Sequence, residues 1–296
     1  MHVPVLQKEV IDYLDPKPND NFIDCTIDGG GHALVILEKT GPNGKILGID
    51  WDKKVISNLK SKIANLELKN RLILTCDNFA NLKEIVKEEN FESISGVLFD
   101  LGLSSWHLEE SERGFSFQKD EPLDMRYDKG EKLTAEKILN EYSRREIEKI
   151  LKEYGEEMFA ERIAQNIVDF RKSEPVKNTF QLVEIIKKSV PYWYQRQRRH
   201  FATKTFQALR IAVNDEIRNL EKALPQALEA ILPEGRLVFI SFHSLEDRIV
   251  KNFFREKAKE GNLKIITKKP IHPSWTEIKK NPRSRSAKLR AAIKIN

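Results

Sequence analysis

The stretch NFIDCTIDGGGH, residues 21–32, decides the fold. It begins as a short apolar segment, passes through three consecutive glycines and continues into a periodic apolar stretch over residues 32–38. These features predict a strand, a glycine turn and a helix. Glycines let a backbone approach a ligand closely, and the amides of a helix N-terminus favour a carboxylate or phosphate. The stretch therefore predicts the start of an α/β domain with a ligand site beside its glycines.

The same alternation continues to residue 102. Further strands are predicted by apolar runs at residues 45–50, 71–77 and 96–102, with helices between them at residues 53–66 and 81–89. Strands separated by helices imply a parallel sheet with right-handed crossovers.

A different pattern follows, because the periodicity is helical from about residue 133 to residue 190. Four amphipathic helices are predicted there, and Thr134 and Thr179 are expected to cap two of them: residues 134–142, 144–154, 157–172 and 179–189. A long helical stretch over residues 201–232 follows, with an expected break near Pro225.

Strand character returns near the end of the chain. We predict a strand, a helix and two late strands there, at residues 235–241, 247–259, 263–267 and 289–295. The expected organisation is thus an α/β domain formed by residues 1–108 and 201–296. An all-helical insertion over residues 109–200 interrupts this domain.

Composition narrows the class of protein. The 296 residues suggest about two domains. Only two cysteines occur, which excludes a disulfide framework and a multi-cysteine zinc site. No segment approaches the ~18 uninterrupted apolar residues of a membrane span, and the N-terminus lacks the layout of a signal peptide. A soluble, cytoplasmic protein without a metal or a membrane partner is therefore expected; the sequence leaves its oligomeric state open.

The positive charge is concentrated in two places. Residues 268–296 hold nine basic side chains and one acid, whereas the chain as a whole carries 51 basic and 45 acidic side chains. Residues 187–204 hold six basic side chains and no acid, interleaved with aromatic residues. Cations beside aromatic rings suit phosphates and stacked bases, so RNA is the expected partner. The alternative is a solvated basic loop that its aromatic residues anchor to the core.

Two aspartates stand where a nucleoside would bind. Asp50 and Asp100 end the second and fourth predicted strands, and ligands of open parallel sheets bind beyond these carboxyl ends. A carboxylate after the second strand suits a ribose diol. The glycine turn matches neither G-x-G-x-x-G nor the P-loop, which argues against a dinucleotide and a nucleoside triphosphate. A nucleoside ligand without phosphate, S-adenosylmethionine, fits better.

At this point the sequence resembles the bacterial 16S ribosomal RNA (cytosine-N4)-methyltransferases. The resemblance rests on motifs that run in family order along nearly the whole chain: DCTIDGGGH (24–32), DLGLSS (100–105), RGFSF (113–117), PLDMR (122–126), YGEE (154–157), HFATKTFQALR (200–210), ISFHSLEDRIVK (240–251) and NPRSRS (281–286). This sequence departs from the family at two positions, with Asp28 in place of glycine and His107 in place of glutamine.

The resemblance implies a class I, Rossmann-like methyltransferase with a parallel-dominated sheet and a helical insertion. Its members methylate the exocyclic N4 of a cytidine in the decoding region of small-subunit ribosomal RNA, with S-adenosylmethionine as donor. Carried over residue by residue, the expected donor pocket comprises Gly30, Gly31, His32, Asp50, Phe79, Asp100 and His107. Phe79 follows the third strand, where an aromatic ring can stack on adenine.

The expected chemistry is an in-line displacement in which the cytosine amine attacks a sulfonium methyl. The lone pair of this amine is delocalised into the ring, so a nearby acceptor and a near-attack geometry are required. Asp100 is the candidate catalytic residue; the alternative is that it only binds the donor. The target base must leave its stack. The candidate RNA-contacting residues are Arg113, Arg126, Arg199, His200, Arg210, Arg283 and Arg285. Each could instead make a structural salt bridge, above all Arg126 beside Asp124 and Asp128. His243, beyond the last main strand, is a second candidate at the acceptor; the alternative is a structural hydrogen bond.

Three other functions remain to be weighed. An amino-methyltransferase of DNA is disfavoured because the turn after the fourth strand is Leu-Gly-Leu-Ser-Ser rather than Pro-Pro-Tyr or Pro-Pro-Phe, and a small-molecule enzyme would not need the basic C-terminal stretch. A non-catalytic RNA-binding or assembly factor predicts an impaired donor pocket. A nicotinamide-dependent oxidoreductase is disfavoured by the missing dinucleotide motif.

Overall fold

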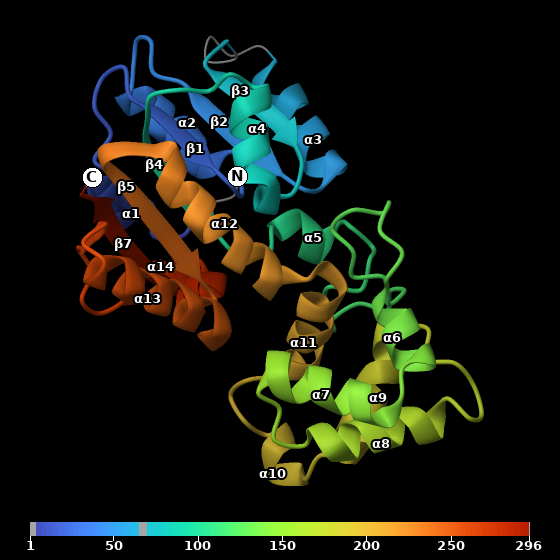
Figure 1. The fold of residues 1–296 in the computed structure, drawn as a ribbon. Coiled ribbons are helices and arrows are strands. Elements are labelled where there is room, and N and C mark those ends of the chain that lie inside the picture. Colours follow the sequence, from blue (N-terminus) through green and yellow to red (C-terminus); the bar gives the residue numbers. More distant parts are fainter. Residues whose placement is uncertain (1–3, 65–69, 296) are drawn as a thin grey trace. The chain divides into compact units, whose positions relative to one another are not determined.

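The structure is a computed structural model that describes residues 4–64 and 70–295. The chain divides into two compact units, a sheet unit of residues 1–102 and 217–296 and a helical unit of residues 103–216 (Figure 1). The division falls earlier than the expected boundary at 108/109 and later than the one at 200/201. The second difference arises because residues 202–213 bury side chains in the core of the helical unit.

The sheet unit contains one seven-stranded sheet in the order β3-β2-β1-β4-β5-β7-β6. The first five strands are parallel, and β7 pairs antiparallel with both β5 and β6. Their bounds are β1 Asn21–Asp24, β2 Ile46–Asp50, β3 Leu72–Cys76, β4 Ile94–Asp100, β5 Ile231–Ser241, β6 Leu263–Ile265 and β7 Lys288–Lys294. The strand order reverses direction between β1 and β4, which is where ligands bind in such sheets.

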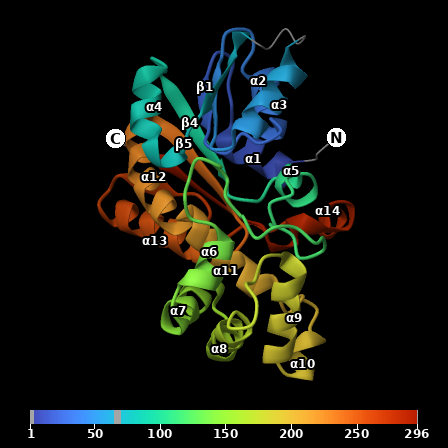
Figure 2. The same ribbon diagram turned by 90° about the vertical axis from the view of Figure 1, so that its right-hand side faces the viewer.

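Helices cover both faces of this sheet (Figure 2). One face packs against α1 Gln7–Leu14, α2 Gly31–Lys39 and α3 Lys53–Ile63. The other packs against α4 Leu82–Glu88, α12 Glu216–Ala230 and α13 Ser244–Lys259. Side chains alternate between the two cores along each strand, as Phe22 and Ile23 do in β1, because the side-chain period of a strand is two. Helix α14 Trp275–Lys280 and the 3₁₀ helix η3 Pro282–Ser286 lie between β6 and β7 in the chain.

The helical unit has a core of its own. Its helices are α5 Ser105–Glu109, α6 Ala135–Glu141, α7 Arg144–Gly155, α8 Ala160–Phe170, α9 Thr179–Ser189, α10 Tyr192–Gln195 and α11 Thr203–Asn214. Helices α7 and α11 approach so closely that a Cβ at Gly155 would lie 2.8 Å from the carbonyl oxygen of Lys204. Leu139, Leu151, Ile163 and other aliphatic side chains fill this core.

Most expected elements are present, with two corrections. The stretch expected to be helical over residues 201–232 breaks after α11, at Asp215, whose φ is +48°. Helix α12 continues through Pro225, where the break was expected. The cap of α9 is Asn178, whose side chain accepts from the backbone N–H of Gln181, and not Thr179. Thr179 instead donates its hydroxyl to the carbonyl of Lys119. The last two residues of the helix expected at 53–66 lie outside the described residues.

Candidate active site

The glycine loop links β1 to α2 at the point where the strand order reverses. Gly30 has φ +75°, and a Cβ at Gly31 would lie 2.4 Å from Cγ of Pro4, so both positions require glycine. A Cβ at Gly29 would meet nothing within 4 Å, so the loop is open on that side. Asp28 has φ +41°, a left-handed conformation that favours glycine, which explains why glycine suits this position.

His32 and Asp100 face one another beside this loop. Nε2 of His32, at the start of α2, lies 3.5 Å from Oδ2 of Asp100, at the end of β4. Both His32 nitrogens and Oδ1 of Asp100 are buried and make no hydrogen bond among the described residues. Buried polar atoms of native proteins are nearly always paired, so this group is suited to hydrogen bonds with a polar ligand.

Asp24 is a third member of this group that the sequence analysis did not single out. Its carboxylate is buried at the end of β1 and accepts a hydrogen bond from the backbone N–H of Thr26. Burial raises the pKa of Asp24 to about 6, against the opposing influence of His32. Only its position at the end of a strand could have drawn attention to it, since its importance comes from the proximity of His32.

Asp50 closes β2 on the neighbouring side of the loop. Its two carboxylate oxygens accept from the backbone N–H groups of Asp52 and Asp28, at 2.9 and 3.3 Å. Burial raises the pKa of Asp50 to about 8, and the charge of Asp28 adds to this shift. The carboxyl is thus held at a fixed place at the carboxyl end of the sheet, as contact with a ribose diol requires.

Phe79 lies just after β3, in the 3₁₀ helix η2 Phe79–Asn81 that the side chain of Asn78 caps. Its ring is half-buried and meets the ring of Phe99 edge-on at 5.5 Å. The sheet unit thereby brings together six of the seven expected donor-pocket residues, all at the carboxyl ends of β1 to β4 or in the loops that follow: Gly30, Gly31, His32, Asp50, Phe79 and Asp100.

His107, the seventh, belongs to the helical unit. It lies in α5, is buried, and packs edge-on against the rings of Phe115 and Tyr127, both at 5.1 Å. The structure thus places His107 in an aromatic cluster of the other unit.

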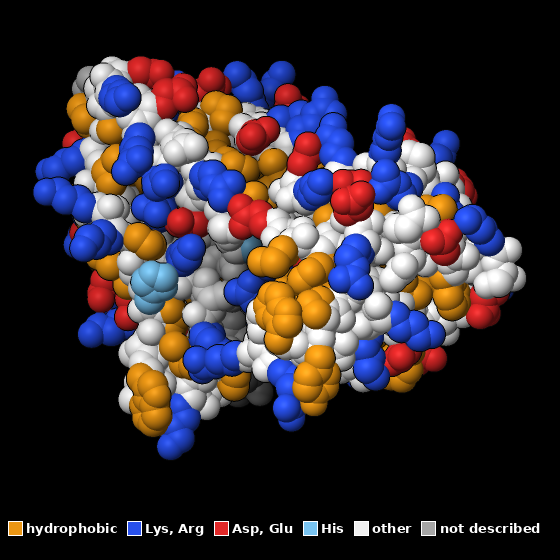
Figure 3. All heavy atoms as spheres, turned by 90° about the horizontal axis from the view of Figure 1, so that it is seen from below, with side chains coloured by type: hydrophobic (Ala, Val, Ile, Leu, Met, Phe, Trp, Pro, Cys, Tyr) orange, Lys and Arg blue, Asp and Glu red, His pale blue; other side chains and the backbone are white. Residues whose placement is uncertain are grey.

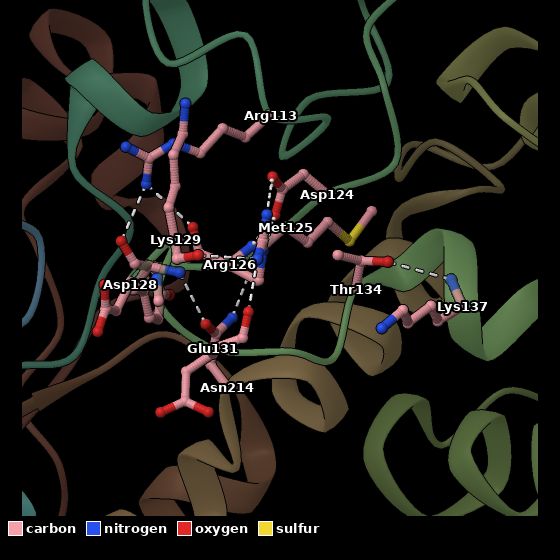
Figure 4. Close-up of polar contacts among 12 residues, drawn as sticks. Arg113, Asp124, Met125, Arg126, Asp128, Lys129, Glu131, Thr134, Lys137 and Asn214 are labelled. Atoms are coloured by element: carbon pink, nitrogen blue, oxygen red, sulfur yellow. Dashed lines mark hydrogen bonds and ion pairs between the residues drawn. The ribbon is translucent and has the colours of Figure 1, made fainter.

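Three of the arginines expected to contact RNA are engaged within the helical unit, and Figure 4 shows two of them, Arg113 and Arg126. Arg113 is buried and donates to the backbone carbonyls of Arg126 and Tyr127, at 3.0 and 2.9 Å. Arg126 forms a bidentate ion pair with Asp124, at 2.6 and 2.9 Å. Arg210 forms another with Glu216, at 2.8 and 2.9 Å. Their guanidinium groups hold loops and helix ends in place.

His243 also has a structural partner. It is the N-cap of α13, where Nδ1 accepts from the backbone N–H of Glu246 and Nε2 lies 2.9 Å from Oε1 of Glu246. The other candidates are exposed. Arg199 and His200 follow α10, and the His200 ring stacks on Phe117 and Phe201 at 4.4 and 4.2 Å. Arg283 and Arg285 are exposed on η3.

The sequence profile of the MraW methylase family matches residues 1–295. The chain belongs to the MraW methylase family. Among its curated relatives, the ribosomal RNA small subunit methyltransferase H of Heliobacterium mobile is 46% identical over 99% of both chains. The protein of the same name from Halothermothrix orenii is 45% identical over 99% of this chain and 98% of its own.

Comparison with solved structures concerns the fold alone. A crystal structure assigned to an rRNA-methylase of Clostridium thermocellum superposes with a TM-score of 0.50 at 13% identity, over 100% of both chains. This likeness confirms the expected α/β methyltransferase fold. Family membership confirms the expected methyltransferase activity and, with it, S-adenosylmethionine as the methyl donor. No helix of the described chain combines the length and the apolar character needed to cross a membrane.

Proposed function

We propose that the chain methylates the exocyclic N4 of a cytidine in the decoding region of 16S ribosomal RNA, within the small subunit and in the cytoplasm. Support comes from the relatives, which are named for the small-subunit ribosomal RNA, and from the motifs by which this sequence resembles the cytosine-N4 methyltransferases. The observation that carries the proposal is the group of buried polar atoms on His32 and Asp100 that make no hydrogen bond among the described residues, at the reversal point of a methylase sheet.

The donor pocket follows from the chemistry of the residues present. Asp50 suits the ribose hydroxyls, the half-buried ring of Phe79 suits adenine, and the amides near Gly30 and Gly31 suit the amino-acid carboxylate. When bound, S-adenosylmethionine supplies an electrophilic methyl group. His32 lies 3.5 Å from Asp100, and Asp24 interacts electrostatically with both of them at this end of the sheet. We assign His107 to the same pocket on the resemblance alone.

Asp100 has the chemistry needed at the acceptor. Its Oδ1 atom is buried and accepts no hydrogen bond among the described residues. Its backbone N–H donates to Oγ1 of Thr26 at 2.6 Å, which fixes the turn after β4. An acceptor of this kind would orient an N–H of the cytosine amine and localise its lone pair. The amine nitrogen would then form the new bond to the methyl carbon as the carbon–sulfur bond breaks, and one N–H proton of the amine would pass to solvent.

The RNA contacts divide into two kinds. We assign the exposed Arg199, His200, Arg283 and Arg285 to the RNA itself, as phosphate or base contacts. The engaged Arg113, Arg126 and Arg210 would act by shaping the loops that approach RNA, and His243 by shaping the start of α13.

The deciding experiment uses radiolabelled methyl donor and small ribosomal subunits that lack the modification. Digestion of the RNA should release labelled N4-methylcytidine from one position, and Asp100→Ala should lower the transfer rate at least 100-fold. Methyl transfer only to naked RNA or only to DNA, or no methyl transfer at all, would show that the assembled subunit is not the substrate. If the chain binds RNA but does not bind the methyl donor, the proposed enzymatic activity is wrong and the chain is better explained as an assembly factor.

A further inference from the structure

The short helix α10 presents two large aromatic rings to solvent. Tyr192 is 68% exposed and Trp193 is 55% exposed, whereas their neighbour Tyr194 is only 6% exposed. Apolar rings of this size are normally buried, so two adjacent exposed ones indicate a surface that binds something. Tyr192 and Trp193 are called the aromatic pair below.

The Trp193 ring of the aromatic pair is supported by buried and half-buried neighbours. The hydroxyl of Tyr194 donates to the buried carboxylate of Glu157, at 2.8 Å. The Trp193 ring rests edge-on against the rings of Phe159 and Tyr194, at 5.9 and 5.7 Å. Rings already fixed in this way lose little conformational freedom when a ligand stacks on them.

Positive charge surrounds the aromatic pair. The guanidinium carbon of Arg196 lies 5.0 Å from the centre of the Tyr192 ring. Arg196, Arg198 and Arg199 are all exposed, and residues 187–204 contain no acidic side chain. Figure 3 shows hydrophobic side chains bordered by Lys and Arg on the face seen from below Figure 1, the end at which α10 lies there.

We propose that the aromatic pair stacks unpaired bases of RNA, while Arg196, Arg198 and Arg199 bind the flanking phosphates. This inference rests on the proposed function and names a contact surface for its substrate. The charge decides between occupants: three arginines without an acid repel a second copy of the same surface, but they match a polyanion. Stacking also selects single strands, because bases within a duplex offer no free face.

The test measures the affinity of the full chain for a fluorescent single-stranded oligonucleotide and for a duplex RNA of equal length. Tyr192→Ala and Trp193→Ala should each weaken single-strand binding by about tenfold and change duplex binding little. Trp193→Phe, which keeps a ring, should restore most of the affinity. Phe180→Ala removes a 47% exposed ring of α9 and serves as the matched control.

Two further measurements keep the outcomes separate. Calorimetric binding of the methyl donor should be the same in all variants, so a failed donor pocket cannot be mistaken for a failed RNA surface. Unchanged single-strand affinity in the double variant Tyr192→Ala, Trp193→Ala would overturn the proposal. So would a wild-type chain that self-associates in sedimentation through this pair, since that result would make a second copy the occupant.

Discussion

At the scale of single residues, the donor pocket is defined by carboxylates. Asp24, Asp28, Asp50 and Asp100 all lie at the carboxyl ends of β1, β2 and β4 or in the glycine loop. His32 lies at ion-pair distance from one of them, Asp100. The carboxylates of Asp28 and Asp100 favour a cationic ligand, and the methyl donor carries one more positive charge than its demethylated product.

Asp28 should therefore help to discriminate donor from product. Asp28→Asn keeps a residue that tolerates the left-handed conformation, but it removes the charge. We expect donor affinity to fall about fivefold, since unit charges several ångströms apart interact by about 1 kcal/mol. Product affinity should change less than twofold, as measured by calorimetry. Asp28→Gly, the family's usual residue, should behave in the same way; an equal loss for both ligands would contradict the idea.

The buried carboxylate of Asp24 makes stability depend on pH. Because its pKa is raised to about 6 in the folded chain, the folded state binds more protons, and its stability falls as the pH rises from about 4 to about 6. Asp24→Asn removes this titration. Its free energy of unfolding relative to wild type should therefore rise by up to about 3 kcal/mol between pH 3.5 and pH 7.5. Urea unfolding without donor tests this, and a difference independent of pH would refute it.

At the scale of elements, the sequence predicts regular periodic segments well and their ends less well. Strands β1 to β4 and helices α6 to α9 follow from apolar periodicity, because their buried side chains recur at periods of two or about 3.6. Helix α14 buries none of its side chains and so leaves no such pattern. Pro225 suggested a helix break, but α12 continues through it. The break comes at Asp215, which adopts a left-handed conformation, and an aspartate in the sequence does not by itself indicate that conformation.

The cap of α9 offers a direct check at this scale. The Asn178 side chain accepts from the N–H of Gln181, and the Gln181 side chain accepts from the N–H of Asn178. Asn178→Ala should lower the free energy of unfolding by about 1 kcal/mol, because it leaves a helix N–H without its acceptor. Asn178→Asp keeps the acceptor and should cost much less. Thermal unfolding followed by circular dichroism separates the two variants.

At the scale of the whole molecule, fewer of the basic side chains are available to a partner than the sequence suggests. In the basic C-terminal stretch, Arg290 is buried against Asp247 at 2.7 Å, and Lys294 donates to the carbonyl of Ile231. Its single acid, Glu277, accepts from the backbone N–H of Leu6. These partners come from distant parts of the chain, so sequence alone could not show which cations are occupied. Arg113 and Arg210 have partners only 6 to 14 residues away, but their engagement depends on how the chain turns between the partners.

Salt dependence should distinguish exposed arginines from engaged ones. Each phosphate contact with a single strand contributes about 0.7 to the slope of log affinity against log salt concentration. Replacing both Arg283 and Arg285 with Gln should therefore lower the slope by about 1.4. Arg126→Gln breaks the pair with Asp124 and should lower stability while leaving the slope unchanged. Titrations of RNA binding at several salt concentrations measure both slopes.

The interruption of the sheet unit between residues 102 and 217 also determines the order in which the two units can fold during protein synthesis. Strand β4 emerges from the ribosome long before its neighbour β5, so one of its edges stays unpaired while the helical unit is being made. Unpaired edges invite association with other nascent chains. Residues 103–216 carry every side chain of their own core. We therefore expect the helical unit to fold first, and the incomplete sheet to be the stage at which chaperones engage the growing chain.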